Sequence, residues 1–204
     1  MKRRISILLV AVMAIGLLGG CKDKFSPNEN AVYIKKDGSV IAYTVEDFSE
    51  DYYDQAELTS YIDEEIEAFE AEEEGSVKLT SFNVDENGVA HMVMKYDSCE
   101  TYSAFNNVTL FSGSVAEAVA AGYLFDDDFY TIDGGESADA SSASGDVSSD
   151  AVKSLLESKC VITDEALLVK INGEITHVSA TGGKILSEDQ ARSTDWGGLT
   201  YIIY

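Results

Sequence analysis

The 204-residue sequence predicts an α+β fold, in which an antiparallel sheet built from hairpins carries an amphipathic acidic helix on one face. Pairs of alternating apolar runs, separated by Asp-Gly, Asn-Gly or a similar turn, predict the hairpins. A long segment with apolar residues at three- and four-residue spacing predicts the helix.

Three pairs of runs have hairpin character, and each is centred on a turn that ends in glycine. Asn-Gly in the last pair is the strongest short hairpin signal in the chain. The predicted hairpins are Ala31–Lys36 with Ser39–Val45 around Asp37-Gly38, Val77–Val84 with Val89–Tyr96 around Asp85–Gly88, and Ala166–Ile171 with Glu174–Ser179 around Asn172-Gly173.

The predicted helix runs from about Asp54 to Glu74 and ends at Gly75, within a segment of unusual charge. Residues 46–74 hold fourteen acidic residues and no lysine or arginine. Such a helix depends on packing, because like charges repel and acids at its C-terminus oppose the macrodipole. The expected apolar stripe is Leu58, Tyr61, Ile62, Ile66 and Phe69.

The acidic face of this helix has two interpretations. The simpler one is a solvated surface, which is the usual role of a charged helix face. The functional one is an electrostatic patch for a cationic partner or for weakly held Ca²⁺ or Mg²⁺. No other cofactor is expected.

Five domain regions follow from composition. Residues 1–20 are an export signal, 21–30 a polar tether, 31–133 an α+β region and 134–149 a Gly/Ser/Ala/Asp-rich disordered linker or loop. Residues 150–204 are too few to bury much core alone, so we expect them to share the core of the first region. Further expected elements are helices at 97–107, 114–121 (capped by Ser114 and Glu117) and 150–159, and strands at 108–111, 184–186 and 200–204.

The first twenty-one residues indicate where the protein resides. Lys2, Arg3 and Arg4 precede an apolar run of 14 residues, which is shorter than the roughly 20 that a spanning helix needs. The run ends in Leu18-Gly19-Gly20-Cys21, which resembles the lipobox of bacterial prolipoproteins, although Gly19 is an unusual middle residue. The resemblance implies cleavage between Gly20 and Cys21, lipidation of Cys21 and anchoring on the extracytoplasmic face of the cell membrane. With its terminal Tyr201-Ile202-Ile203-Tyr204, the hairpin-rich part resembles lipoproteins of anaerobic Gram-positive bacteria.

Charge restricts the partners of the mature chain. The full sequence has a net charge of −23, and loss of the three basic residues at 2–4 leaves 11 basic against 37 acidic residues, or −26. This charge disfavours nucleic acid and adsorption to an anionic lipid surface.

The inventory of chemically active residues is small. His91 and His177 are the only histidines, and both fall in predicted strands, so a multi-histidine metal site is excluded. Cys99 with either histidine is the best nucleophile pair available, but no motif supports it, and no catalytic residue is assigned. Cys99 and Cys160 could form a disulfide, although the favoured interpretation is that both are buried free thiols. Asp126-Asp127-Asp128 predicts an exposed acidic turn rather than a metal site.

These observations favour a cell-surface, lipid-anchored protein that binds a protein or an envelope component without catalysis. The alternative is an envelope hydrolase with a Cys/His or carboxylate centre. A solute-binding or accessory part of a transporter is a third option, but 184 mature residues are few for two lobes.

Overall fold

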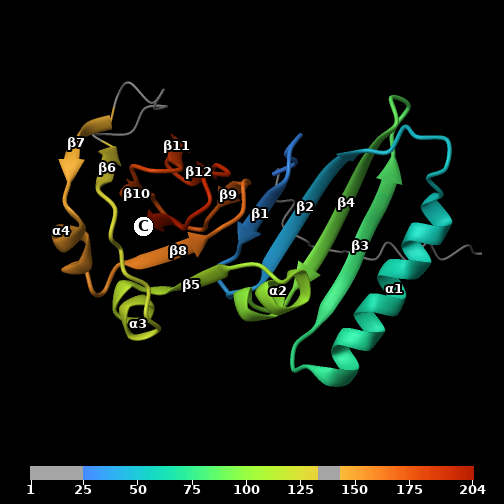
Figure 1. Cartoon of the computed structure of the whole chain (residues 1–204), viewed down its shortest axis with the longest axis horizontal. Coiled ribbons are helices and arrows are strands. Elements are labelled where there is room, and N and C mark those ends of the chain that lie inside the picture. The colour runs from blue at the N-terminus through green and yellow to red at the C-terminus, as the bar shows by residue number, and fades with distance from the viewer. Residues whose placement is uncertain (1–24, 133–142) are drawn as a thin grey trace, which may run out of the picture.

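A computed structural model describes residues 25–132 and 143–204, and Figure 1 labels its elements in chain order. Sheet A contains, from edge to edge, β11 (Gly183–Ser187), β12 (Gln190–Ser193), β9 (Leu168–Lys170), β1 (Ala31–Ile34), β2 (Val40–Asp47), β4 (Val89–Tyr96) and β3 (Val77–Val84). Sheet B contains β5 (Leu110–Ser114), β8 (Lys159–Thr163), β13 (Thr200–Ile203), β10 (His177–Ser179), β6 (Phe129–Ile132) and β7 (Ala143–Val147). The helices are α1 (Gln55–Glu72), α2 (Cys99–Asn106), α3 (Val115–Ala120) and α4 (Ser149–Lys153).

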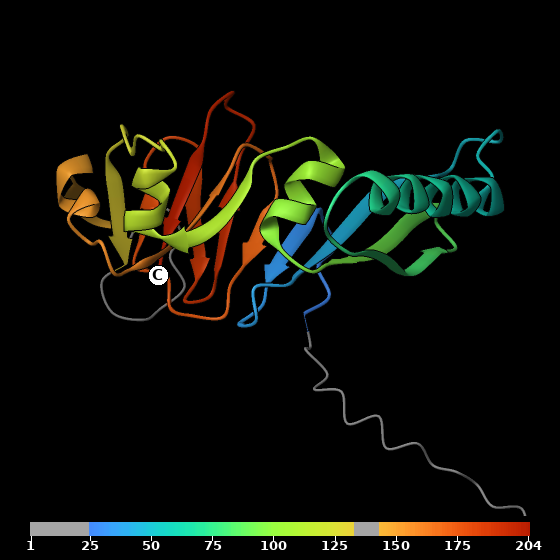
Figure 2. The ribbon, with the colours of Figure 1, turned by 90° about the horizontal axis from the view of Figure 1, so that it is seen from below.

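The predicted α+β class is confirmed, but the strands form two sheets instead of one. At one end of the elongated molecule, α1 packs on β3 and the neighbouring strands (Figure 1). At the other end, sheet B covers the same face of sheet A, and α3 and α4 pack on the far side of sheet B. Figure 2 shows α2 between these two ends.

Two hydrophobic clusters hold these layers together. The larger cluster joins the inward face of sheet A to α1, α2 and one face of sheet B, through Val32, Val40, Met94, Val161, Val169 and Ile202, among others. The smaller cluster lies between the other face of sheet B and α3 and α4, and includes Val115, Phe125, Val152, Ile162 and Tyr201. The larger cluster takes residues from both sides of residues 134–149, so the two parts of the chain bury apolar surface together.

The first two predicted hairpins are present, and both use the same turn. Gly38 and Gly88 have φ values of 85° and 77°, a conformation that suits glycine. Each glycine N–H donates to the carbonyl three residues earlier, from Gly38 to Lys35 (3.0 Å) and from Gly88 to Asp85 (3.1 Å). The first turn therefore centres on Lys36-Asp37 with Gly38 as a bulge residue, one position away from the expected Asp-Gly turn.

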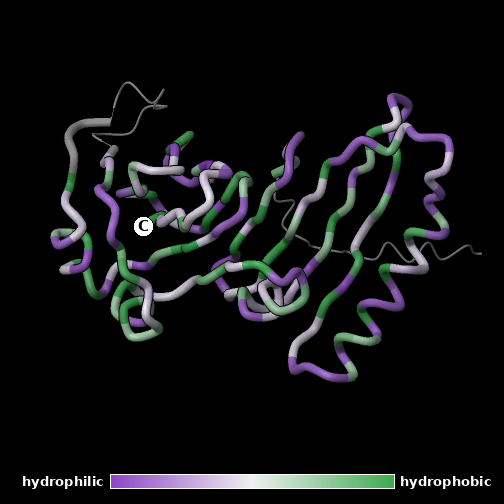
Figure 3. Tube along the Cα trace, viewed as in Figure 1, coloured by the Kyte–Doolittle hydropathy of each residue, from purple (hydrophilic) through white to green (hydrophobic). Residues whose placement is uncertain are grey.

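Helix α1 matches the predicted acidic helix, with Asp54 as its N-cap and Glu72 as its last residue. The Asp54 side chain accepts a hydrogen bond from the Glu57 N–H (2.9 Å), which satisfies one free donor of the first turn. Ile62 is buried, and Leu58, Ile66 and Phe69 pack partly against the larger cluster. Tyr61 was wrongly assigned to this stripe, because 57% of its surface is exposed. Figure 3 shows that α1 is otherwise mostly hydrophilic.

The predicted capping box at Ser114 is confirmed. The Ser114 hydroxyl accepts from the Glu117 N–H (3.1 Å), and the Glu117 carboxylate accepts from the Ser114 N–H (2.6 Å). The strand before it, β5, is longer than expected, because it pairs along its whole length with β8.

The third predicted hairpin is wrong. Strand β9 pairs with β1 and β12 in sheet A, whereas β10 pairs with β6 and β13 in sheet B, so Asn172-Gly173 connects two sheets. Two isoleucines that flank this turn, Ile171 and Ile175, are buried, and the Tyr204 ring packs against Gly173 so closely that an added Cβ would lie 2.6 Å from it. Burial of the flanks therefore overrides the local turn preference.

The prediction of a disordered linker or loop at residues 134–149 is also wrong in part. Residues 134–142 lie outside the described part of the chain, but residues 143–147 form β7, which pairs with β6, and α4 begins at Ser149. The expected helix at 150–159 is shorter, since α4 ends at Lys153 and β8 begins at Lys159. Strands β6 and β12 were not predicted from the sequence, and β11 and β13 lie close to the predicted positions.

Candidate functional site

The candidate functional site is a shallow hollow at the end of the molecule where β2 leads into α1. It has a volume of about 370 Å³ and is lined by seven residues, which we call the aromatic tip: Phe48, Tyr52, Tyr53, Asp54, Glu57, Leu58 and Tyr61. Tyr52, Tyr53 and Tyr61 are 74%, 45% and 57% exposed, which is unusual for such large rings.

Ring contacts hold the aromatic tip in place. Phe48 stacks on Tyr53 with 4.8 Å between centroids, and Tyr52 meets Tyr53 edge to face at 4.7 Å. Phe48 also contacts Phe82 of β3 edge to face at 5.9 Å, which ties the loop to the sheet. The rings are therefore arranged before any ligand arrives.

Backbone contacts fix the loop that carries these rings. The Phe48 N–H donates to the Gly88 carbonyl in the β3–β4 turn (2.7 Å), and the Tyr53 N–H donates to the Glu50 carbonyl (3.0 Å). Gly88 packs against Ser49 so closely that a Cβ there would lie 2.9 Å from the Ser49 Cβ. The two loops at this end therefore support each other.

The surroundings of the aromatic tip are negative. Six acidic residues lie between Glu46 and Glu57, and no lysine or arginine occurs between Lys36 and Lys78. A hydrogen bond with Tyr52 raises the pKa of Tyr53, and the charges of Glu50 and Asp47 add to this effect. Neutral, electron-rich ring faces beside carboxylates are the groups that attract an organic cation.

A second surface lies on the side of sheet A that faces away from α1. Alternation along β1, β2, β4 and β3 places thirteen residues there, which we call the outward face: Ala31, Tyr33, Ile41, Tyr43, Val45, Asp47, Lys78, Ser81, Asn83, Val89, His91, Val93 and Lys95. Residues 26 and 27 lie against part of it and, with Tyr43, Val45, Asn83 and His91 among others, line a hollow of about 270 Å³.

The chain is fixed to the outward face at Phe25, the first described residue. The Phe25 ring meets Tyr43 at 5.3 Å and Tyr33 at 6.1 Å, both edge to face. The Lys170 ammonium lies 5.5 Å from the Phe25 ring and 5.6 Å from the Tyr33 ring.

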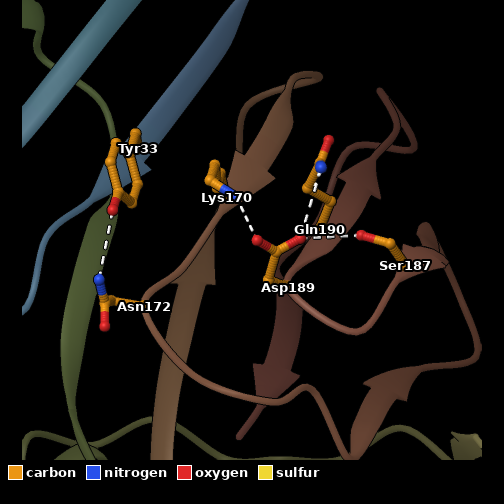
Figure 4. Close-up of polar contacts among 6 residues, drawn as sticks. All are labelled: Tyr33, Lys170, Asn172, Ser187, Asp189 and Gln190. Carbon is orange, nitrogen blue, oxygen red and sulfur yellow. Dashed lines mark hydrogen bonds and ion pairs between the residues drawn. The ribbon is translucent and has the colours of Figure 1, made fainter. Parts of the chain in front are cut away.

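Polar contacts hold this arrangement from the side of β9 and β12. Lys170 pairs with Asp189, which also accepts from Ser187 (2.9 Å) and Gln190 (3.4 Å), as Figure 4 shows. The Tyr33 hydroxyl accepts from Asn172 (3.3 Å; Figure 4). The Lys170 charge is thus already compensated, and its role here is to position Phe25 and Tyr33.

Cys99 and Cys160 are free buried thiols, and no disulfide joins them. Cys99 belongs to the larger hydrophobic cluster and Cys160 to the smaller one, on opposite faces of sheet B. Burial raises the pKa of each thiol to about 12, so both are protonated at neutral pH. A protonated, enclosed thiol is a poor nucleophile.

The structure does not bring Cys99 together with either histidine. His91 projects from the outward side of β4, where its Nε2 lies 3.7 Å from Asp85, whereas Cys99 lies on the inward side. His177 is in sheet B, and its Nδ1 lies 2.9 Å from the Thr176 hydroxyl. The Cys/His centre of the hydrolase alternative is therefore not assembled.

The predicted acidic turn at 126–128 has a structural role. Asp127 accepts from the Thr181 N–H (2.7 Å) and hydroxyl (3.2 Å), which ties this turn to the β10–β11 connection. Within residues 25–132 and 143–204, no three His, Cys, Asp or Glu side chains form a cluster able to hold a metal ion.

Gly20 and Cys21, the predicted cleavage and lipidation residues, lie outside the described residues. Among the helices of the described ranges, none is both long enough and apolar enough to span a membrane.

Comparison with protein-family models, curated proteins and solved structures finds no match to this chain. The aromatic tip therefore has to be interpreted from its own geometry. The acidic segment is evident in the sequence, but the exposed rings were not predicted, because the helical spacing of Tyr61 indicated a buried stripe. The signal that could have revealed them is the pair Tyr52-Tyr53 among acids just before the Asp54 cap.

Proposed function

We propose that this protein is a lipid-anchored binding protein of the extracytoplasmic membrane face, which captures cationic groups at its aromatic tip without catalysis. The observation that carries the proposal is the hollow in which three exposed tyrosines stand beside carboxylates. Lysine- or arginine-rich segments of proteins, and quaternary amines, have the matching chemistry.

The strength expected of this site is modest. A cation over an exposed ring gains about 0.5–1 kcal/mol, and exposed charge pairs add little at physiological salt. Useful affinity therefore requires several contacts at once, which favours a peptide with several basic side chains over a single cation. The buried, protonated cysteines and the separated histidines give the hydrolase alternative no support.

Binding is tested by titrating the mature chain with hexa-arginine and measuring heat. Changing Tyr52 and Tyr53 together to Ala should weaken binding by about 5- to 30-fold, from the loss of two ring contacts. Tyr52→Phe with Tyr53→Phe keeps the ring faces and should bind nearly as the wild type does. Equal binding by the Ala and Phe variants would show that charge alone attracts the peptide.

Anchoring is tested separately in cells that export the protein. Intact mass should show a diacylglyceryl group on Cys21, and Cys21→Ser should leave the precursor uncleaved or release a soluble form. Wild-type protein recovered in the medium with a free Cys21 thiol would contradict the anchor.

A further inference from the structure

The outward face of sheet A differs in charge from the rest of this acidic protein. On β1, β2, β4 and β3, the outward strand positions include Lys78, Lys95 and His91, with Asp47 at the end of β2 as the one acid. Asp85, in the turn between β3 and β4, also lies on this side, 3.7 Å from His91. Helix α1, which carries much of the acidic charge, packs on the opposite side of the same strands.

Lys78 and Lys95 are placed directly opposite each other on β3 and β4. Both side chains are exposed, and neither forms an ion pair of 4 Å or less within the described ranges. Asp37 partly compensates the charge of Lys95. The pKa of this carboxyl is lowered mainly by hydrogen bonds from Ser39 and in smaller part by the charges of Lys35 and Lys95. Like charges in opposite cross-strand positions are destabilising, so the fold itself gains nothing from this pair. An anionic partner would remove the repulsion.

The position of Phe25 places one edge of this face close to the predicted anchor. Cys21 precedes Phe25 by four residues, which span at most about 14 Å when fully extended. Phe25 is seated on Tyr33 and Tyr43, so a lipid on Cys21 would hold Phe25 within that distance of the bilayer, with the edge of the outward face that it contacts beside it. The aromatic edge of this face would then be the part nearest the membrane.

We propose that the outward face of sheet A docks on the anionic lipid headgroups of the bilayer that holds the anchor. The inference rests on the proposed lipidation of Cys21. The net charge of −26 disfavours adsorption to such a surface. In the docked protein, however, the thickness of sheet A and of α1 separates the α1 carboxylates from the lipid headgroups. That thickness, more than about 10 Å, exceeds the Debye length of about 8 Å at physiological ionic strength.

The test places a solvent-sensitive fluorophore on the lipidated full chain through Ser81→Cys, and on the opposite side through Glu64→Cys. Both sites are exposed, and the native thiols Cys99 and Cys160 are buried. In vesicles containing phosphatidylglycerol, the probe at position 81 should be shielded from acrylamide, whereas the probe at position 64 should stay accessible. In phosphatidylcholine vesicles both probes should stay accessible.

Charge variants decide whether the lysines cause the shielding. Lys78→Gln with Lys95→Gln should lower the docked-to-undocked ratio by about fivefold for each lysine. Lys153→Gln with Lys159→Gln, which makes the same charge change near sheet B, should leave the shielding intact. Equal shielding in both vesicle types, or none in either, would overturn the proposal, as would shielding by soluble polyphosphate but not by vesicles.

Vesicle flotation of the same samples separates this proposal from the anchor. If the wild type fails to float, the proposed lipidation fails. Docking is then measured on the chain from Cys21 onward, whose N-terminal aminothiol is condensed with a lipid aldehyde to a thiazolidine, which leaves the thiol at position 81 for the fluorophore. An accessible probe at position 81 in that preparation would refute the docking itself.

Discussion

The two ends of sheet A differ in what covers them. Beside α1, the strands have one buried and one outward face, and β2, β3 and β4 each extend over eight residues that alternate. At the other end, sheet B lies between sheet A and α3 and α4, so its strands β8 and β13 are buried on both sides. Strand β13 is buried at all four positions. We call the end beside α1 the first region and the end covered by sheet B the second region. Stability should therefore concentrate in the second region, and binding surfaces in the first.

The largest effect should come from removing a buried side chain where the two sheets meet. Ile202→Ala in β13 should lower stability by about 2–5 kcal/mol, or roughly 5–15 °C in melting temperature. Ile202 is fully buried, so its loss leaves a cavity.

Ile41→Ala on the outward face of β2 is the matched control for the first region. Ile41 is only partly buried, so the cost should stay below about 1 kcal/mol. Thermal and urea unfolding measure both variants. Equal losses would show that the two regions do not differ in packing.

An intermediate effect should come from the charges of α1. Neutralising Glu72, Glu73 and Glu74 to Gln should raise stability by about 1 kcal/mol at low salt, because acids at a helix C-terminus oppose the macrodipole. Added salt or millimolar Ca²⁺ or Mg²⁺ should stabilise the wild type more than this variant.

Three exposed glutamates of the second region supply the control for this charge effect. Glu157→Gln, Glu174→Gln and Glu188→Gln together change the net charge equally but lie outside α1. Melting curves across a salt series compare the two triple variants. Identical salt responses would mean that the excess negative charge acts on the molecule as a whole.

The smallest effect should come from Glu165, at the junction of the two regions. The Tyr102 hydroxyl of α2 donates to its carboxylate (2.8 Å), and burial raises the pKa of Glu165 above 4.5. A raised folded pKa stabilises the fold below the unfolded value, and this contribution is lost as pH rises through the folded value. Glu165→Gln should remove that loss and stabilise the protein at neutral pH by less than about 1 kcal/mol, because the group is partly exposed.

The stability difference between Glu165→Gln and the wild type, measured from pH 4 to 8, isolates this group from the other carboxylates. It should grow with pH. The exposed Glu157→Gln is the control, and its difference from the wild type should stay flat. A difference that shrinks as pH rises would contradict the sign.

The same contrast explains what the sequence could predict. In the first region, glycine turns, alternating apolar runs and the helical spacing that ends at Gly75 are local signals, and they located β2, α1, β3 and β4 closely. In the second region, pairing partners lie far apart in the chain, so Asn172-Gly173 was assigned to a hairpin although its flanking strands enter different sheets.

The functional surfaces were predicted less well than the fold class. The acidic charge of residues 46–74 was visible in the sequence, but the arrangement of Phe48, Tyr52 and Tyr53 depends on contacts with Phe82 and Gly88, which lie over thirty residues later. The charge of the outward face likewise depends on the register that places Lys78 opposite Lys95. The composition of the whole chain therefore reveals neither the aromatic tip nor the charge of the outward face.

Strand β1 has a consequence for the order of folding. It lies in the interior of sheet A and pairs on one side with β2, which follows at once, and on the other with β9, where Ala31 meets Leu168. That second pairing closes a loop of more than a hundred residues, and such non-local contacts form slowly. Until β9 arrives, one edge of β1 offers unpaired backbone groups to any neighbouring chain. A chain exported N-terminus first would pass through this aggregation-prone stage, because β1 is exported well before its partner β9.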